Sequence, residues 1–290
     1  MSEPTTLGSL LDQRGERGAL ERGGVFVDGQ RTESATASLE PGARVEVYAA
    51  REEGASVGIL AQERGLVFAY KPVGLASEPE RRGNASVVTL VAEMLKLDVA
   101  RVHALTRLDV GVSGVVLLGL DSAARQRVHS LREAGAFERR YVALAHSTPN
   151  PANGTWNEAL GKAPGGARRC VSSHGEPATT RYSAVASTLS GASILAFRPL
   201  TGRTHQLRVH ASFHGAPLLG DSTYGGSKRL VLAGGRVIGL PRIYLHAAWI
   251  ALADQSRVET PLPADFGSTW AVLGGKDSDL DRALVEPLGS

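Results

Sequence analysis

Apolar segments of strand length recur along most of this chain, and they constrain its fold more than any other feature of the sequence. They are short, rich in Val, Leu, Ile and Ala, and separated by turn-forming residues. The predicted strands cover residues 66–70, 113–120, 140–146, 180–186, 193–198 and 243–252. Helical spacing interrupts this series at residues 86–97 and again between Ser122 and Gly135, without regular alternation. Strands interrupted by helices in this way indicate an α+β domain.

The first 55 residues are predicted to form a small unit of their own, linker included. A strand at residues 25–27 runs into the turn at Asp28 and Gly29, and alternating residues follow at 45–48. This pattern resembles a degenerate copy of the C-terminal half of a small RNA-binding module named after a small-subunit ribosomal protein. The linker is expected at residues 51–56, the main domain at 56–273 and a peripheral tail at 274–290.

Charge is distributed unevenly along the chain. Residues 1–60 contain 6 Arg and Lys against 10 Asp and Glu, whereas residues 101–210 contain 14 against 6. Nearly all the basic residues of the second segment are arginine, whose planar fork of donors suits phosphate. The middle of the chain is therefore expected to meet a polyanion, although the net charge is only +3.

Several other classes of protein are disfavoured by composition. The single cysteine, Cys170, cannot form an internal disulfide, and no cluster of Cys and His has the spacing of a zinc site. No apolar run is long enough to span a bilayer, and residues 1–18 do not read as a signal peptide. A cytoplasmic protein that holds no metal is expected, with a monomer as the default.

Two segments concentrate residues suited to chemistry. In the first, PLTGRTHQLRVH from residue 199, Thr204 is the expected N-cap of a short helix that carries Arg203 and Arg208. Arginine near a helix start favours phosphate. In the second, Asp109 follows Arg107 and Leu108 directly before a glycine-rich start of an apolar strand. A carboxylate beside buried apolar surface needs a cationic partner to remain ionised.

These segments resemble the two signature motifs of the RluA-type pseudouridine synthases, H-R-L-D-x-x-T-S-G and T-G-R-x-H-Q-[LI]-R-V-H … G-D-x-x-Y-G. Further matches in the same order are K-P-V-G from residue 71, R-Y-V-A from residue 140, G-E-P-A-T-T from residue 175 and L-H-A from residue 245. The family's fold implies a mixed, mainly antiparallel central sheet with flanking helices and a catalytic cleft. One departure is Thr106, which stands where the family has histidine.

The resemblance also implies roles for individual residues. Asp109 matches the catalytic aspartate, and Arg208 matches the arginine that pairs with it. Arg107 matches the arginine that enters the RNA when the target nucleotide flips out. Tyr141 matches the tyrosine that stacks on the target base, and Leu207 an apolar residue of the pocket wall. Arg203 is expected to bind substrate phosphate.

Isomerisation of uridine suits this inventory of residues. The bond from ribose to the base nitrogen breaks, the base rotates, and ribose joins carbon 5 of the base, so that no electron or group is imported and no cofactor is expected. Asp109 would act by covalent attack or by proton abstraction, and the sequence leaves both open. The expected substrate is structured ribosomal or transfer RNA. The alternative is an RNA-binding ribosome-assembly factor whose activity has decayed. A glycosidase is disfavoured, because no motif supplies a second carboxylate.

Overall fold

The structure is a computed structural model that describes residues 6–14, 16–21, 25–48, 56–79, 85–166, 168–232, 235, 237–255 and 257–288. The chain divides into two units. The smaller contains Met1–Glu53 and Ser227–Pro241, and the larger contains Gly54–Gly226 and Arg242–Ser290. Apart from residue 56, the linker expected at 51–56 lies outside the described residues.

The smaller unit packs two helices against a sheet of order β14-β15-β3-β1-β2. Its helices are α1 (Leu7–Gln13) and α2 (Gly18–Glu21), and its strands are β1 (Val25–Val27), β2 (Gln30–Arg31), β3 (Val45–Tyr48), β14 (Arg229–Val231) and β15 (Val237–Gly239). The boundary differs from the one expected at residue 55, because β15 pairs with β3 in parallel. A distant segment of the chain therefore covers what would otherwise be an open edge of β3.

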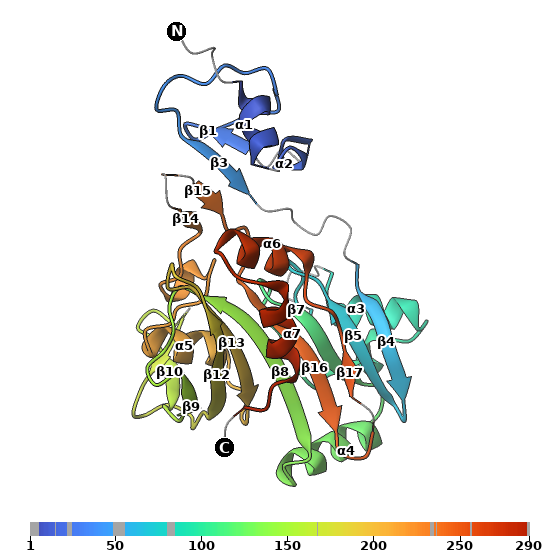
Figure 1. Cartoon of the computed structure of the whole chain (residues 1–290). Coiled ribbons are helices and arrows are strands. Elements are labelled where there is room, and N and C mark those ends of the chain that lie inside the picture. Colours follow the sequence, from blue (N-terminus) through green and yellow to red (C-terminus); the bar gives the residue numbers. More distant parts are fainter. Residues whose placement is uncertain are drawn as a thin grey trace. The chain divides into compact units, whose positions relative to one another are not determined.

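The larger unit is built on a ten-stranded sheet with the order β4-β5-β7-β16-β8-β13-β12-β9 along its main path (Figure 1). These strands are β4 (Gly58–Glu63), β5 (Leu66–Lys71), β7 (Ser113–Gly119), β8 (Phe137–Ala145), β9 (Asn153–Trp156), β12 (Thr180–Ser187), β13 (Ser193–Pro199) and β16 (Leu245–Leu252). The short strands β6 (His103–Ala104) and β17 (Val258–Glu259) pair with β7 and β16. Only β7 and β16 pair in parallel among the described strands of this sheet. The expected mixed, mainly antiparallel sheet of an α+β domain is confirmed.

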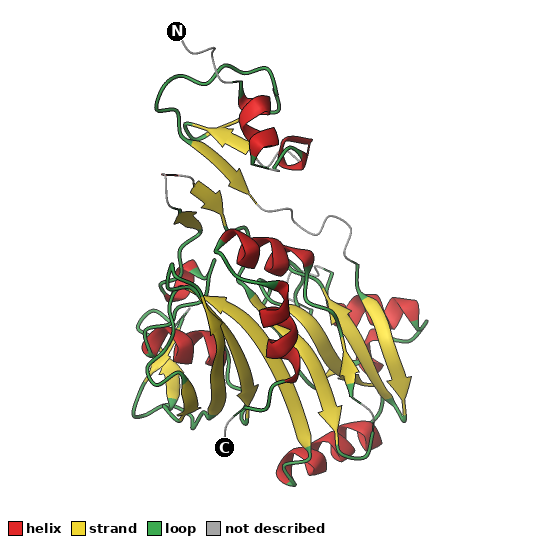
Figure 2. Ribbon diagram, viewed as in Figure 1, coloured by secondary structure: helices red, strands yellow, loops and turns green. Residues whose placement is uncertain are grey.

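Helices surround this sheet rather than alternating with its strands (Figure 2). They are α3 (Val87–Met94), α4 (Ser122–Glu133), α5 (Gln206–Phe213), α6 (Ala264–Val272) and α7 (Asp277–Val285), with 3-10 turns η1 (Val99–Arg101) and η2 (Ser222–Tyr224). A separate pair of strands, β10 (Leu160–Lys162) and β11 (Arg169–Val171), completes the unit. No described helix is long and apolar enough to cross a membrane.

Residues 274–288 belong to the larger folded unit and do not form a peripheral tail. Helix α7 packs across β8, β12 and β13 and buries Leu280 and Ala283. Arg140, which is 4% exposed, donates from Nε to the carbonyl of Ala283 at 2.9 Å and from Nη2 to that of Glu286 at 2.5 Å. The apolar positions of residues 274–290 are spaced at helical intervals, which is why this segment finds a place on the sheet.

Gly114, the second residue of β7, stands where only glycine fits. Its φ is +125°, and a Cβ atom there would lie 2.2 Å from the carbonyl oxygen of Ala247 on β16. No other residue tolerates both that backbone conformation and that approach. The glycine lets β7 run directly beside β16, which fixes where the loop before β7 meets the rest of the sheet.

Candidate active site

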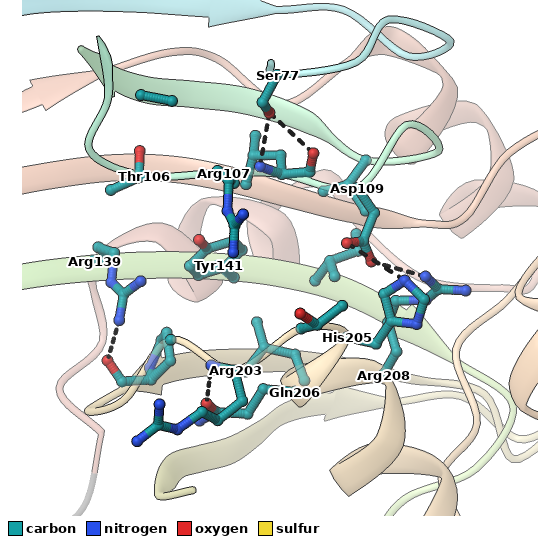
Figure 3. Close-up of a pocket in the computed structure, with 18 of the residues that line it drawn as sticks. Ser77, Thr106, Arg107, Asp109, Arg139, Tyr141, Arg203, His205, Gln206 and Arg208 are labelled. Atoms are coloured by element: carbon teal, nitrogen blue, oxygen red, sulfur yellow. Dashed lines mark hydrogen bonds and ion pairs between the residues drawn. The ribbon is translucent and has the colours of Figure 1, made fainter. Parts of the chain in front are cut away.

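The six site residues expected from the sequence line one cleft of about 1190 Å³. Asp109 and Arg107 lie in the loop between β6 and β7, called here the Asp109 loop (residues 105–112), and Tyr141 lies on β8. Leu207 and Arg208 belong to α5, and Arg203 lies in the turn before it. Segments far apart in the sequence therefore meet at the cleft, and Figure 3 shows Asp109 pointing toward Arg208 and His205.

Arg208 is hydrogen-bonded to two carboxylates at the cleft. Its Nη1 donates to Asp109 at 2.7 Å, while Nε and Nη2 donate to the two carboxylate oxygens of Asp221 at 2.6 and 2.8 Å. The side chain of Asp221 is 1% exposed, and that of Asp109 is 26% exposed. Burial opposes the charge on Arg208, but its hydrogen bonds to Asp221 and the charge of Asp109 raise the pKa of Arg208 above the ordinary value. Arg208 thus joins a buried carboxylate to one that faces the cleft.

Helix α5 begins one residue later than expected. Its N-cap is His205 and not Thr204, and His205 has the left-handed φ of +58°. His205 Nδ1 shares a hydrogen bond of 2.6 Å with the hydroxyl of Tyr224, while Nε2 lies 3.7 Å from Asp109. Burial, together with the charge of Arg208, lowers the pKa of His205 although Asp109 opposes the shift. A non-glycine residue with such a backbone conformation beside a functional cleft is held there by its surroundings.

Two side chains hold the backbone of the Asp109 loop in place. Ser77 Oγ accepts from the backbone N–H of Leu108 at 2.9 Å and donates to the carbonyl of Leu108 at 3.0 Å. Lys71, at the end of β5 and fully buried, donates to the carbonyls of Leu75 at 2.7 Å and Val110 at 3.5 Å. The backbone on both sides of Asp109 is therefore anchored to the end of β5 and to the segment that follows it.

Thr106 has a structural contact of its own. Its hydroxyl accepts from the backbone N–H of Leu117 on β7 at 2.8 Å, and the residue is 5% exposed. The replacement of the family's usual histidine therefore leaves this end of the Asp109 loop hydrogen-bonded to the sheet.

The walls of the cleft combine apolar and cationic side chains. Tyr141 and Leu207 are each 7% exposed and pack in one apolar cluster, and burial raises the pKa of the Tyr141 hydroxyl. Arg107 is 63% exposed and lies 3.2 Å from Glu78. Arg203 lies 2.5 Å from Glu176 and donates from Nε to the carbonyl of Pro177 at 3.0 Å.

The histidines of α5 and its C-cap serve as structural contacts. His210 is buried between the hydroxyl of Thr180 and the carbonyl of Glu158, both at 3.0 Å. His214 pairs with Glu158 at 3.0 Å and stacks on Trp156. Within the part of the chain that the structure describes, no group of three or more His, Cys, Asp and Glu could hold a metal ion.

Asp221, His205, Tyr224 and Ser77 belong to this site, although the sequence interpretation gave them no role. The signal for Asp221 and Tyr224 was present in the Gly-Asp-x-x-Tyr-Gly segment that follows α5. The sequence does not tell which of several carboxylates a given guanidinium reaches.

A model of the family described as RNA pseudouridylate synthase matches residues 65–213, which include the Asp109 loop, Tyr141 and Arg208. This chain belongs to that family. The dual-specificity RNA pseudouridine synthase RluA of Escherichia coli (strain K12) is 31% identical over 215 residues, which cover 72% of this chain and 93% of that protein. The protein is accordingly an RNA pseudouridine synthase, an isomerase of RluA type.

Two further relatives extend the comparison. The uncharacterized RNA pseudouridine synthase YhcT of Bacillus subtilis (strain 168) is 28% identical over 276 residues, covering 92% of this chain and 82% of that protein. The solved structure of human RNA pseudouridylate synthase domain containing 4 superposes with a TM-score of 0.59 at 26% identity, covering 75% of this chain and 93% of that one. The pseudouridine synthase fold expected from the sequence is confirmed.

Proposed function

We propose that this synthase converts specific uridines of structured ribosomal or transfer RNA to pseudouridine with Asp109 as its catalytic residue and without a cofactor. The observation that carries the proposal is the ion pair of 2.7 Å between Asp109 and Arg208 at the wall of a cleft of about 1190 Å³. Pockets for small ligands measure roughly 300–1,000 Å³, so this cleft has room for a nucleotide and part of its strand.

Arg208 and Asp221 prepare Asp109 for this reaction. Arg208 orients the Asp109 carboxylate, and the buried Asp221 holds Arg208 by two of its nitrogens. Asp109 attacks the sugar or the base, or takes a proton from the sugar, and both routes need the carboxylate to face the flipped nucleotide. The base then rotates within the cleft without leaving it.

The target nucleotide must leave the RNA stack to reach Asp109. Tyr141 offers a stacking surface at the cleft wall and Leu207 an apolar contact, which offset the lost stacking by roughly 1–3 kcal/mol. Arg107 is suited to fill the gap in the RNA. Its partner Glu78 is exposed and an exposed ion pair is weak, so RNA phosphates compete for the guanidinium at little cost. Arg203 also lines the cleft, on the segment before α5, and is placed to contact the RNA backbone.

Mapping of pseudouridines in total RNA tests both the substrate and the role of Asp109. RNA from cells with the gene, without it, and without it but carrying a plasmid-borne copy is compared. We expect sites that vanish with the gene, return with the wild-type copy and fail to return with Asp109→Asn. Sites restored equally by Asp109→Asn would refute the role of Asp109, and no gene-dependent sites would favour the RNA-binding assembly factor.

A further inference from the structure

One face of strand β8 lines the cleft with a row of three side chains. The proposed reaction uses only one of them, Tyr141. Phe137, Arg139 and Tyr141 alternate along the strand and all line the cleft. Figure 3 shows Arg139 and Tyr141 along this strand. At a rise of about 3.3 Å per residue, Arg139 lies roughly 7 Å and Phe137 roughly 13 Å along the strand from Tyr141. The row therefore leads away from the target base along the cleft.

Two arginines contact the ring of Phe137. The guanidinium carbon of Arg132, in the last turn of α4, lies 4.7 Å from the ring centroid, and that of Arg139 lies 5.4 Å from it. Both distances are within the range of cation–π contacts. These three residues, Arg132, Phe137 and Arg139, are called here the Phe137 clamp.

No carboxylate in the described part of the chain neutralises the positive charge of the Phe137 clamp. Arg132 donates to the carbonyl of Leu105, and Arg139 to the carbonyls of Pro199 and Thr201 at 3.2 and 2.9 Å. Among the described residues, no carboxylate forms an ion pair with either arginine. Two like charges on one ring without a counterion form a site that favours an anion.

We propose that the Phe137 clamp binds the phosphodiester backbone of the substrate RNA beside the flipped nucleotide. The proposal rests on the proposed function and adds a subsite to it. The planar guanidinium of arginine matches the geometry of phosphate. Grooves that bind single-stranded nucleic acid without reading its sequence combine cations along the backbone with aromatic rings. Because the clamp and Asp109 line the same cleft, the strand that carries the flipped uridine passes from one to the other.

Arg132 is the residue on which the proposal is best tested. Arg139 also holds the turn at Pro199 and Thr201, so its loss would disturb the segment that precedes α5. Arg132 is exposed in the last turn of α4 and donates to the carbonyl of Leu105. Glutamine keeps an N–H donor at this position, so Arg132→Gln is expected to fold normally. Arg125→Gln is the matched control, because Arg125 is also exposed on α4 but does not line the cleft.

The experiment measures binding of fluorescein-labelled decauridylate by the full chain at potassium chloride concentrations from about 50 to 300 mM. For Arg132→Gln, the slope of log affinity against log salt is expected to fall in magnitude by about 0.7, the share of one phosphate contact on a single strand. Affinity near 0.1 M salt is expected to fall about fivefold. Arg132→Lys should retain most of the slope, and Arg125→Gln should behave as the wild type.

The proposal would be refuted if the wild type and Arg132→Gln had equal salt slopes. It would also be refuted if Arg125→Gln lost as much slope and affinity as Arg132→Gln. This result is separable from a failure of the proposed function. If gene-dependent pseudouridines exist in cellular RNA while the slope is unaffected, only the subsite is wrong. If no such pseudouridine exists, the proposed function fails whatever the slope.

Discussion

At the scale of single residues, Arg208 is the side chain on which the site depends. It contacts two carboxylates with three nitrogens, and only a planar fork can reach both at once. The ion pair with the buried Asp221 fixes the guanidinium, which leaves Nη1 directed at Asp109. Asp221, which does not line the cleft, thereby determines the position of the Asp109 carboxylate through Arg208.

Arg208→Lys is expected to lower both activity and stability. A lysine retains the charge but has one nitrogen, so Asp221 loses its paired contact and remains buried. We expect the free energy of unfolding to fall by about 3 kcal/mol, as for a broken buried ion pair. Activity, measured as tritium release from RNA labelled at carbon 5 of uridine, should fall by roughly 100-fold or more. Arg127→Lys is the control, because Arg127 pairs with a partly exposed Asp254 and should lose less than about 1 kcal/mol.

Ser77→Ala is expected to loosen the Asp109 loop. The hydroxyl satisfies both backbone groups of the buried Leu108, and its loss should cost about 1–3 kcal/mol of unfolding free energy. Because Asp109 is the next residue, the turnover rate should also fall roughly tenfold through misplacement. Chemical denaturation and turnover measurements check the two effects. Ser130→Ala, on the exposed face of α4, should change neither, and an unaltered rate in Ser77→Ala would show that Leu108 needs no such anchor.

At the scale of elements, strands were easier to predict from the sequence than helix termini. Apolar runs and alternation placed β5, β7, β12 and β13 within about a residue of their ends. β5, β7 and β13 are buried on both faces and therefore appear in the sequence as nearly continuous apolar runs, whereas β12 is buried mainly on one face and alternates. The start of α5 was misplaced. Thr204 has the usual capping side chain, but tertiary contacts of His205 with Tyr224 and Asp109 set the cap instead.

The parallel contact of β7 with β16 has a titratable group at its centre. His246 on β16 is fully buried and shares a hydrogen bond of 2.8 Å between its Nδ1 and the hydroxyl of Ser113 on β7. Burial, and then the charge of Arg242, lower the pKa of His246 to about 3. This histidine is therefore neutral in the folded protein well below the pH at which it protonates in the unfolded chain.

His246 is expected to make stability depend on pH between about 6.5 and 3. In that range the unfolded chain binds a proton at His246 and the folded protein does not, so the contribution is complete above about pH 6.5 and is lost as the pH falls toward 3. Through His246, the free energy of unfolding changes by at most about 1.4 kcal/mol per pH unit. Denaturant unfolding of wild type and His246→Asn between about pH 7 and 5 measures it. If the free energy of unfolding depended equally on pH in the two proteins, His246 would not be the source of the pH dependence.

At the scale of the whole molecule, the order of the family motifs predicted the site better than local sequence patterns predicted the domain boundaries. All six expected site residues line one cleft, because each lies in a segment whose order along the chain matches the family. Their individual roles stay predictions. The smaller unit could not be delimited from the sequence, since the pairing of β3 with β15 joins segments far apart and leaves no local signal.

The larger unit carries the whole cleft, so it is expected to retain activity alone. In the test, residues 1–55 are deleted and 227–241 are replaced by a short Gly-Ser link, which removes both parts of the smaller unit. We expect this protein to release tritium from uridine-labelled RNA at a rate within about tenfold of the full chain. Deleting residues 1–55 alone should instead cause aggregation, because it exposes the edge of β15 and the apolar Val237. A folded but inactive larger unit would mean that the smaller one contributes to the reaction.

The most direct measurement of the central claim is tritium release by purified Asp109→Asn. The amide keeps the shape of the carboxylate but cannot attack or take a proton, so we predict that release falls to background while folding and RNA binding persist. Circular dichroism and decauridylate binding provide those two controls. Release at the wild-type rate from a folded Asp109→Asn protein would contradict the account, because the pair of Asp109 and Arg208 would then not be what isomerises uridine.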